Sequence, residues 1–403
     1  MKIVQINACY DRGSTGRMMK EMHHFYLKHG HDSYVCAPNC HSKDFRIINI
    51  GCKFDYLLHS LLSRILGLQG YFSILSTILF LRKLSKIKPD ILHLHNLHNN
   101  YINLPLLFRY IIKDDIATVV TMHDFWFMTG HCCYYTNDNC NKWQKSCGHC
   151  PAIKTYNKSW FWDCSSWLRK KKEMYFTQIK RLAIIGNSKW TTREIKKSFL
   201  GKSSIATHIY NWIDTDVFYP RGKNKCRLKY GYKNSDIIIL GVAQGWNKLK
   251  GLEVIEKLAI RNPQYKFVLV GEILDKRTFS TNIISIGTIK DTSLLAEYYS
   301  LSDVYINPSI QETFGLVTAE AIACGLPVIA NNATATPELV LEGCGSIVNS
   351  NNIEEFEKEI KTIIGTHKSP DTMHNLAETK FGKENINKNL DVYKRLLVYE
   401  TNN

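Results

Sequence analysis

Short runs of β-branched and other apolar residues alternate with helical patterns along almost the whole chain. Strand-like runs separated by helices favour βαβ units and parallel sheets. The runs form two series that meet near residues 211–220, and 403 residues suffice for two domains with separate cores. We therefore predict an α/β protein of two parallel-sheet domains. The predicted strands cover residues 3–7, 91–96, 117–124, 182–187, 205–211, 237–243, 267–272, 283–289, 304–307 and 328–331.

The charge balance of the chain is unusual. Lys and Arg total 52 against 36 Asp and Glu, a formal net charge of +16. This excess favours a polyanionic partner such as nucleic acid, an anionic membrane surface or a phosphorylated substrate. Residues 165–202 hold eleven basic and two acidic residues, and aromatic side chains flank or interrupt the stretch. A basic helix with such neighbours fits a membrane-surface face and equally a solvated helix. The aromatic residues are Trp160, Phe161, Trp162 and Trp167.

We expect neither a secretion signal nor a membrane span. Residues 1–7 are too short and too strand-like for the apolar core of a signal peptide. Residues 54–84 are the most apolar stretch, but Arg64, Gly67 and Gly70 interrupt it. We predict two amphipathic helices there, which either join the core or contact lipid. Thirteen cysteines without a secretion signal predict a reducing compartment, where thiols stay free or bind metal.

The segment 311–329 places two glutamates, Glu312 and Glu320, eight residues apart. Glu312 follows the predicted strand 304–307, and open α/β sheets bind ligands at the carboxyl ends of their strands. Gly315 opens a predicted helix whose free N–H groups suit an anion, and Glu320, two turns on, can face the same crevice. This arrangement suits a ligand that carries both hydroxyls and phosphate. The alternative is a solvated helix with two surface glutamates.

A cysteine cluster between residues 130 and 151 has the spacing of a zinc site. It contains a C-x2-C knuckle with three more cysteines within twenty residues. Four thiolates would close a tetrahedral structural site and leave no open position for catalysis. Two disulfides or free buried thiols are the alternatives, and a reducing compartment disfavours disulfides. The four predicted ligands are Cys132, Cys140, Cys147 and Cys150, and Cys133 or His149 could replace one of them.

The segment 311–329 resembles the E-x7-E signature of family 4 retaining glycosyltransferases, and the similarity extends over nearly the whole chain. That family has the GT-B fold, in which two Rossmann-like, doubly wound domains face each other across a cleft. The bacterial surface-polysaccharide subset, which makes exopolysaccharide, capsule or O-antigen, is similar to residues 121–151 as well. The resemblance implies an acceptor-side domain over 1–210 with a cysteine-rich insertion at 130–151, a nucleotide-sugar-binding domain over 211–375, and a C-terminal helix over 376–403 that packs back on the first domain.

The resemblance also implies roles for single residues of the second half. Glu312 would contact hydroxyls of the donor sugar, Glu320 the ribose, and Lys250 the diphosphate. The family's usual arginine is missing, since Gln244 or Leu249 stands in its places. Lys248 would substitute for it as a point charge rather than a bidentate fork. The backbone that would cradle sugar and diphosphate belongs to Phe314, Gly315, Leu316 and Val317.

In the first half, the resemblance points to the loop at residues 13–17, whose glycines allow a tight turn against a ligand. Gly16 and Arg17 would face the donor diphosphate, although an ordinary βα turn is the alternative. His123 would line the site beside the donor sugar, where its imidazole can hydrogen-bond a hydroxyl or carry a proton. A core histidine held by Asp124 is the other reading of that residue. Asn187 would line the cleft.

Three histidines follow one another at positions 93, 95 and 98. His93 and His95 share one face of a strand, which is the geometry of a pair of metal ligands. No carboxylate accompanies them locally. The resembled family often carries a His-x-His at this place, which implies a lining or structural role.

The activity implied is that of a retaining hexosyltransferase-type enzyme. It would move a sugar from a nucleotide-sugar donor to a glycan or a polyprenyl-diphosphate-linked acceptor, with no cofactor required for catalysis. We expect a cytoplasmic enzyme that associates peripherally with the anionic inner face of the cell membrane through its basic, aromatic-flanked stretch. A nucleic-acid-binding zinc protein is one alternative, although the usual nucleic-acid motifs are missing and we expect no nucleic acid partner. A nucleotide-sugar epimerase on the same fold is the other.

Overall fold

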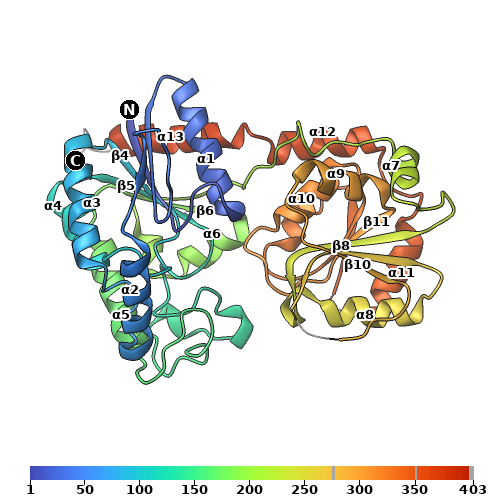
Figure 1. Cartoon of the computed structure of the whole chain (residues 1–403), viewed down its shortest axis with the longest axis horizontal. Coiled ribbons are helices and arrows are strands. Elements are labelled where there is room, and N and C mark those ends of the chain that lie inside the picture. The colour runs from blue at the N-terminus through green and yellow to red at the C-terminus, as the bar shows by residue number, and fades with distance from the viewer. Residues whose placement is uncertain (275–276, 350–351, 399–403) are drawn as a thin grey trace. The chain divides into compact units, whose positions relative to one another are not determined.

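The computed structural model describes residues 1–274, 277–349 and 352–398, and the chain forms two compact units (Figure 1). Unit 1 comprises Met1–Ile209 and the C-terminal residues from Ile386, and unit 2 comprises Tyr210–Asn385. The predicted boundary at 375 is therefore wrong. The helix α12 (Pro370–Phe381) stays in unit 2, because Met373, Ala377 and Phe381 are buried in the core of that unit.

Within the described residues, unit 1 contains a sheet of seven strands in the order β3-β2-β1-β4-β5-β6-β7, and each neighbouring pair is parallel. The central strands are buried along their whole length, as in parallel sheets with helices on both faces. The strands are β1 (Lys2–Ile6), β2 (Asp32–Ala37), β3 (Ile47–Asn49), β4 (Ile91–Leu94), β5 (Ala117–Met122), β6 (Leu182–Gly186) and β7 (Ile205–His208). The helices are α1 (Gly13–Lys28), α2 (Lys53–Leu66), α3 (Ile74–Ile87), α4 (Leu104–Lys113), α5 (Ser165–Thr177), α6 (Lys189–Lys196) and α13 (Asn385–Val398).

Unit 2 has a second parallel sheet, of six strands in its described part, in the order β10-β9-β8-β11-β12-β13. The prediction of two parallel-sheet domains is confirmed, although β2, β3 and β13 were not among the predicted strands. The strands are β8 (Ile238–Trp246), β9 (Lys266–Ile273), β10 (Ile283–Gly287), β11 (Val304–Asn307), β12 (Val328–Asn331) and β13 (Gly345–Val348). The other helices of the unit are α7 (Lys223–Lys229), α8 (Leu252–Arg261), α9 (Thr292–Leu301), α10 (Leu316–Ala323) and α11 (Ile353–Ile363).

Each sheet has one point where its strand order reverses, between β1 and β4 in unit 1 and between β8 and β11 in unit 2. Ligands of open α/β sheets bind outside the carboxyl ends of the strands at such a point. In unit 1, Asn7 follows β1, and its side-chain oxygen accepts the N–H of Asn96, which follows β4. In unit 2, Lys250 follows β8 and Glu312 follows β11.

The apolar stretch at residues 54–84 forms two helices, as predicted. α2 ends at Gly67, whose φ of 68° is the left-handed conformation of a helix C-cap, and α3 begins at Ile74. In the part of the chain that the structure describes, no helix is long and apolar enough to cross a membrane.

Candidate active site

An ion pair joins the loops that follow β8 and β11, at the switch point where the strand order of unit 2 reverses. Lys250 Nζ lies 2.6 Å from Glu312 Oε1, and the two side chains are 33% and 15% exposed. The contact therefore remains open to solvent. An ammonium has three N–H donors and the carboxylate occupies one of them, so Lys250 can hold Glu312 and an anion together.

The turn that carries Lys250 is fixed against the loop after β11. Asn247 caps this 3-10 turn, and its side-chain oxygen accepts the N–H of Lys250 at 3.1 Å. Gly251 closes the turn with a φ of 74°, and a Cβ there would stand 2.5 Å from the carbonyl oxygen of Pro308. Asn247 was not predicted as a site residue, although a capping Asn before a turn that ends in Gly is a recognisable signal. Lys248 lies exposed on the same turn.

The loop after β12 fixes the backbone of Glu312. Glu312 donates its N–H to Thr334 Oγ1 at 2.9 Å, and its carbonyl oxygen accepts the N–H of Ala335 at 3.2 Å. Thr334 has a φ of 52°, which is uncommon for a residue other than glycine. The sequence analysis missed Thr334, because nothing in the local pattern reveals a contact 22 residues away.

The predicted cradle lies where α10 begins. Gly315 has a φ of 102°, a conformation that side chains rarely adopt, and the helix starts at Leu316. Phe314 is buried, and its ring packs against Phe381, with 5.7 Å between the ring centroids. Burial of Phe314 turns the backbone of Gly315, Leu316 and Val317 into the first turn of the helix, where N–H groups are available to an anion.

Glu320 lies half-buried on α10 and is held by α9. The hydroxyl of Tyr299 lies 3.1 Å from Glu320 Oε2 and 3.1 Å from the carbonyl oxygen of Val317. Burial raises the pKa of Tyr299 well above its ordinary value, with a further contribution from Glu320, so this hydroxyl stays protonated. Tyr299 is a positioning residue that the sequence analysis missed.

Three of the residues predicted to bind the donor, Gly16, Arg17 and Asn187, lie in unit 1. α1 begins at Gly13, so Gly16 and Arg17 belong to its first turns rather than to a loop, and a Cβ at Gly16 would stand 3.1 Å from Cys9 Sγ. The exposed Arg17 donates to the carbonyl oxygen of Gly13. Asn187 is buried, and its side-chain oxygen accepts from Thr191 on α6. Gly16 and Asn187 thus make packing contacts within unit 1, and their roles at the donor stay predictions.

A chain of buried histidines crosses the sheet of unit 1. His93 Nε2 lies 2.8 Å from Thr121 Oγ1, and His93 Nδ1 lies 2.6 Å from the hydroxyl of Tyr393 on α13. His95 Nδ1 lies 3.0 Å from His123 Nε2. At that distance one ring nitrogen carries the proton and donates it in a hydrogen bond to the other. Burial lowers the pKa of His93 to about 3 and that of His123 to about 4, so both are neutral near pH 7.

This histidine chain predicts a specific pH dependence of stability. Between pH 6.5 and about 4 the unfolded chain protonates these residues and the folded chain does not, so the unfolded state binds more protons and stability falls as the pH drops. We expect the thermal midpoint of the full chain to decrease over this window, and His93→Gln to flatten the decrease. The exposed His29 is the control, because His29→Gln should leave the profile unchanged. An identical slope for His93→Gln and the unsubstituted chain would contradict the assignment.

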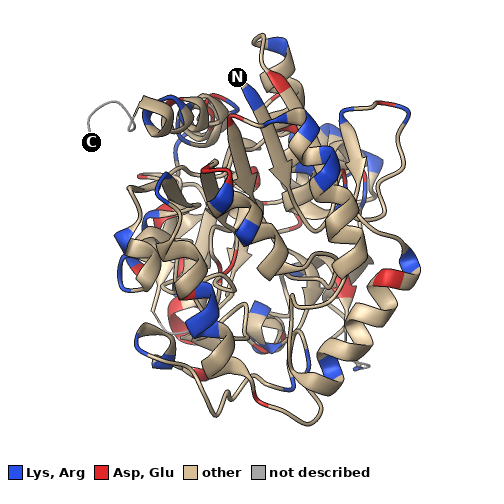
Figure 2. Cartoon of the chain, turned by 90° about the vertical axis from the view of Figure 1, so that its left-hand side faces the viewer, with Lys and Arg blue, Asp and Glu red and all other residues tan. Residues whose placement is uncertain are grey.

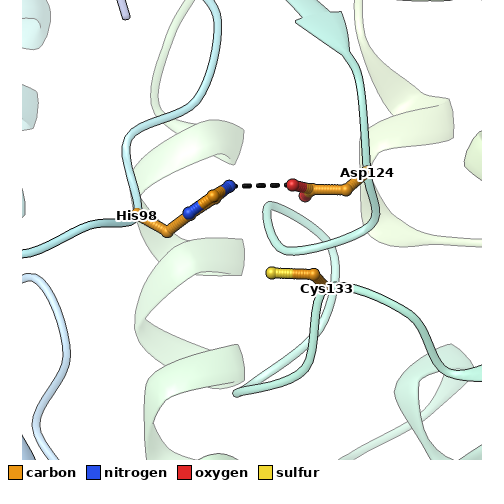
Figure 3. Close-up of side chains that lie close together, drawn as sticks. All are labelled: His98, Asp124 and Cys133. Atoms are coloured by element: carbon orange, nitrogen blue, oxygen red, sulfur yellow. Dashed lines mark hydrogen bonds and ion pairs between the residues drawn. The ribbon is translucent and has the colours of Figure 1, made fainter. Parts of the chain in front are cut away.

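A second polar cluster brings His98, Asp124 and Cys133 together (Figure 3), with their ligand atoms within 4.8 Å of one another. His98 Nε2 lies 2.8 Å from Asp124 Oδ2, and Asp124 Oδ1 accepts the N–H of Trp126. Asp124 therefore pairs with His98, while His123 Nε2 lies against His95. Burial raises the pKa of the Cys133 thiol well above its ordinary value.

The cysteine cluster surrounds a cavity of about 20 Å³ in the insertion at 130–151. All four predicted ligands line it: Cys132, Cys140, Cys147 and Cys150. The N–H of Gly130 donates to Cys147 Sγ at 3.4 Å. Among the described residues, however, no three of these sulfurs lie within 4.8 Å of one another, whereas sulfurs around a tetrahedral zinc are about 3.8 Å apart. The thirteen cysteines are free in this structure.

One histidine beside these cysteines, His131, was not predicted as a ligand. His131 is 2% exposed and lines the same cavity, and its Nε2 atom has no hydrogen-bond partner among the described residues. Burial lowers the pKa of His131 to about 4, so the ring is neutral, which is the form that binds a metal. Buried polar atoms without a partner are costly, and a metal ion in the cavity would remove that cost.

Two family models together cover most of the chain. One, described as Glycosyltransferase Family 4, matches residues 15–217, just over half of the sequence, and one described as Glycosyl transferases group 1 matches residues 224–380. The chain belongs to glycosyltransferase family 4. The resemblance of the segment 311–329 is confirmed, and the protein is an enzyme of the hexosyltransferase type. Membership of this family decides against both the nucleic-acid-binding zinc protein and the epimerase.

Two similar proteins have names that refer to surface-polysaccharide synthesis. An uncharacterized 41.2 kDa protein in the cps region of Klebsiella pneumoniae is 26% identical over 384 residues, which cover 90% of this chain and 92% of that protein. The putative colanic acid biosynthesis glycosyl transferase WcaC of Escherichia coli K12 is 23% identical over 287 residues, covering 66% of this chain and 65% of WcaC. The chain is thus similar to the surface-polysaccharide subset of family 4.

Solved structures of the same fold show that both units belong to the GT-B type. Sucrose-phosphate synthase from Thermosynechococcus elongatus superimposes with a TM-score of 0.70 at 16% identity, covering 99% of both chains. The Anabaena protein HepE, solved in complex with UDP and glucose, superimposes with a TM-score of 0.64 at 16% identity, covering 97% of this chain and 98% of HepE. The predicted GT-B fold of family 4 is confirmed.

Proposed function

We propose that this family 4 glycosyltransferase is a retaining enzyme that transfers a hexose from a nucleotide-sugar donor to a glycan or a polyprenyl-diphosphate-linked acceptor. The observation that carries the proposal is the Lys250–Glu312 pair at the switch point of the unit 2 sheet. One partner offers a cation to a diphosphate, and the other offers an acceptor to sugar hydroxyls. The first turn of α10 begins four residues after Glu312.

Lys250 and the start of α10 would stabilise the departing diphosphate. Positive charge that is already in place where negative charge develops is a large contribution to catalysis, and the N-terminus of a helix adds to it. Lys248, exposed on the turn of Lys250, is a second cation. Since these protein groups neutralise the diphosphate, catalysis needs no metal ion.

The two glutamates would bind different parts of the donor, Glu312 the sugar and Glu320 the ribose. Glu312 would accept from hydroxyls of the sugar while it keeps Lys250, because an ionised carboxylate has about four acceptor sites. Glu320, placed by Tyr299, would accept from the ribose. The role of His123 beside the donor sugar stays a prediction, and so does the role of Arg17 at the diphosphate.

In the proposed reaction, a hydroxyl of the acceptor attacks the anomeric carbon on the face from which the diphosphate departs. The new C–O bond forms as the bond to the diphosphate oxygen breaks, and the proton of the hydroxyl passes to that oxygen. The anomeric configuration is retained. Positioning of the two substrates would supply much of the rate. The E-x7-E spacing of Glu312 and Glu320 supports this stereochemistry, because it resembles the signature of retaining enzymes.

The similar proteins support the substrate classes. HepE was solved with UDP and glucose, which supports a nucleotide-sugar donor here. The relatives from the cps region and from colanic acid synthesis support an acceptor that belongs to a surface polysaccharide. We place the reaction at the cytoplasmic face of the cell membrane, where a polyprenyl-diphosphate-linked acceptor would be presented.

We also propose that the cysteine insertion binds one structural zinc ion. Three sulfurs would come from Cys132, Cys147 and Cys150, and the fourth ligand from Cys140 or from His131. The shared cavity and the unpartnered Nε2 atom of His131 support this proposal. The loops of the insertion would draw closer around the ion. With four protein ligands the ion would hold these loops together and take no part in catalysis.

A panel of nucleotide sugars tests the donor proposal. We expect calorimetric titration of the full chain to detect micromolar binding of at least one nucleoside diphosphate sugar, and binding of the corresponding nucleoside diphosphate. The product formed with a synthetic polyprenyl-diphosphate sugar should keep the anomeric configuration of the donor, as measured by NMR. Binding of none of the donors would contradict the proposal, and an inverted product would contradict its stereochemistry.

A further inference from the structure

The outer surface of unit 1 leaves a row of large apolar side chains on α2 in solvent. Phe54, Leu57, Leu58 and Leu61 stand at i, i+3, i+4 and i+7, which is one stripe of a helix, and their exposure ranges from 44% to 73%. The opposite side of α2 buries His59, Ser60 and Ser63 instead. Scattered exposed apolar residues are ordinary, but a continuous stripe indicates an interaction site.

Aromatic residues far along the chain extend this stripe. Trp160, Phe161 and Trp162 are 49%, 71% and 63% exposed. The N–H of Trp160 donates to the carbonyl oxygen of Arg64 at 2.7 Å, and a Cβ at Gly67 would stand 2.5 Å from the carbonyl oxygen of Trp162. The C-terminal end of α2 and the three aromatic residues therefore form one surface.

The first turn of α3 completes the surface. His59 Nδ1 on α2 lies 2.7 Å from Ser73 Oγ, directly before α3, and the exposed Ile74 and Leu75 follow. The thiol of Cys164, directly before α5, donates to the carbonyl oxygen of Leu66 at the end of α2 at 3.4 Å. We call this surface the apolar face: the exposed apolar side chains of α2, of residues 74–75 and of residues 160–162.

The structure changes the role of the basic stretch that flanks these aromatics. Arg169 is 4% exposed and donates to the carbonyl oxygens of Trp143 and Gln144. Lys172 is 2% exposed and donates to the carbonyl oxygens of Trp126 and Thr129. Arg169 thus holds the cysteine insertion from within, and Lys172 holds the loop directly before it. The expectation of a continuous basic face along this stretch is wrong at these two positions.

Exposed cations nevertheless flank the residues of the apolar face along the chain. Lys53 and Arg64 are exposed at the two ends of α2, Lys158 precedes the aromatic residues, and Lys170 lies exposed on α5. Figure 2 shows that Lys and Arg are spread over many helices and loops on this side of the chain, with Asp and Glu among them. The charge on this side is therefore mixed and does not form a single basic stripe, and we call the four cations that flank the apolar residues the cationic rim.

We propose that the apolar face docks on an anionic lipid bilayer, with α2 lying in the plane of the interface. A helix with an apolar stripe buries that stripe at the boundary between headgroups and acyl chains, and tryptophans favour the headgroup level. Lys53, Arg64, Lys158 and Lys170 complement the negative surface. The inference rests on the membrane location in the proposed function but needs no donor chemistry, so its failure would leave the donor proposal unaffected.

The salt dependence of binding distinguishes this mode from a purely electrostatic one. Salt screens the cationic rim over a Debye length of about 10 Å at 0.1 M, whereas it does not weaken the burial of apolar side chains. We therefore expect co-sedimentation of the full chain with phosphatidylglycerol–phosphatidylcholine vesicles to fall only partly between 0.1 and 0.5 M NaCl. Vesicles of pure phosphatidylcholine should bind less.

A triple substitution on α2 tests the face directly. Phe54→Ser, Leu57→Ser and Leu58→Ser together should lower the vesicle partition coefficient at least tenfold, because they remove the apolar stripe. The control removes exposed apolar residues from unit 2, with Leu228→Ser and Ile260→Ser, and should bind as the unsubstituted chain does. Circular dichroism and titration with a nucleoside diphosphate should show that both variants remain folded and keep their donor affinity.

Tryptophan fluorescence gives an independent readout. Vesicles that contain brominated lipids should quench the fluorescence of the full chain, and Trp160→Phe with Trp162→Phe should remove most of that quenching. Vesicle binding by the α2 variant equal to that of the unsubstituted chain would overturn the proposal. So would a chain that binds no vesicles, or a vesicle-free dimer in analytical ultracentrifugation that the α2 variant abolishes, because the face would then join two copies.

Discussion

Replacing Glu312 with alanine is expected to lower sugar transfer by about 10² to 10³-fold, the usual cost of removing one preorganised polar group at a reacting centre, while the affinity for the free nucleoside diphosphate is kept or increased. The reason is the ion pair with Lys250 at 2.6 Å. Without its carboxylate partner, the ammonium of Lys250 becomes fully available to the diphosphate. The measurements are steady-state kinetics with the donor found in the panel and calorimetric titration with the nucleoside diphosphate.

Substitutions of residues around Glu312 should have effects that differ from those of Glu312→Ala. Lys250→Ala should weaken the nucleoside diphosphate and the nucleotide sugar alike. Glu320→Ala should do the same, because the ribose is common to both ligands, and Tyr299→Phe should reproduce part of the effect by releasing Glu320. Since Lys250 and Glu312 are in contact, their effects on donor binding should not be additive.

A control of the same chemistry is available on α11. Glu357 also pairs with basic side chains, Arg261 and Lys361, but lies outside the loops of the site. Glu357→Ala should leave both turnover and affinity unchanged. Full turnover and unchanged affinities in Glu312→Ala and Glu320→Ala would remove both glutamates from the donor site.

Protein purified under reducing conditions is expected to carry about one zinc per chain. Loss of this zinc should lower the stability of the protein more than any other change predicted for it. Structural zinc contributes about 10–16 kcal/mol to the folding of zinc-finger peptides. Even a fraction of that would lower the thermal midpoint on the order of 10 °C for a unit of this size. Cys147→Ser with Cys150→Ser should abolish zinc binding, as measured by elemental analysis, and should increase proteolysis within residues 130–151.

Single variants would identify the fourth ligand. If His131 binds the ion, His131→Ala should release zinc and Cys140→Ala should retain it, and the reverse holds if Cys140 is the ligand. Cys52→Ser is the control, because Cys52 is exposed and lies outside the insertion. Donor affinity should not change in any of these variants. Zinc-free protein whose thiol count reveals disulfides would decide against the site.

The fold of both units follows closely from local patterns. Alternating apolar runs and helical patterns predict parallel sheets, because a strand buried on both faces leaves a continuous apolar run. The predicted strands cover the core of each sheet, including β4, β5, β8 and β11. The edge strands β3 and β13 were missed, and so was β2, the neighbour of β3. They are short or carry polar residues such as Asp32 and Ser346, which weaken the apolar signal.

Residue type and spacing also identified Glu312, Lys250 and the cysteine cluster as candidates. The pairing of the first two depends on strand order. β8 and β11 are neighbours in the sheet although more than 50 residues separate them, so the loops that follow them meet. The supports of the pair, Asn247 and Thr334, become visible only once those loops are in place.

Burial is what the sequence by itself could not determine. The periodicity of a helix predicts that one side is covered, but not which neighbouring element covers it or whether any does. The sequence pattern predicts that Lys172 is a surface cation, yet tertiary contacts bury it beneath the insertion. The row of apolar residues on α2 has the pattern of a helix face that packs on a core, yet no element of the described chain covers Phe54 or Leu57. The sequence determined the elements and their chemistry, whereas only the tertiary structure decided which side chains meet and which face solvent, because those contacts join residues far apart in the chain.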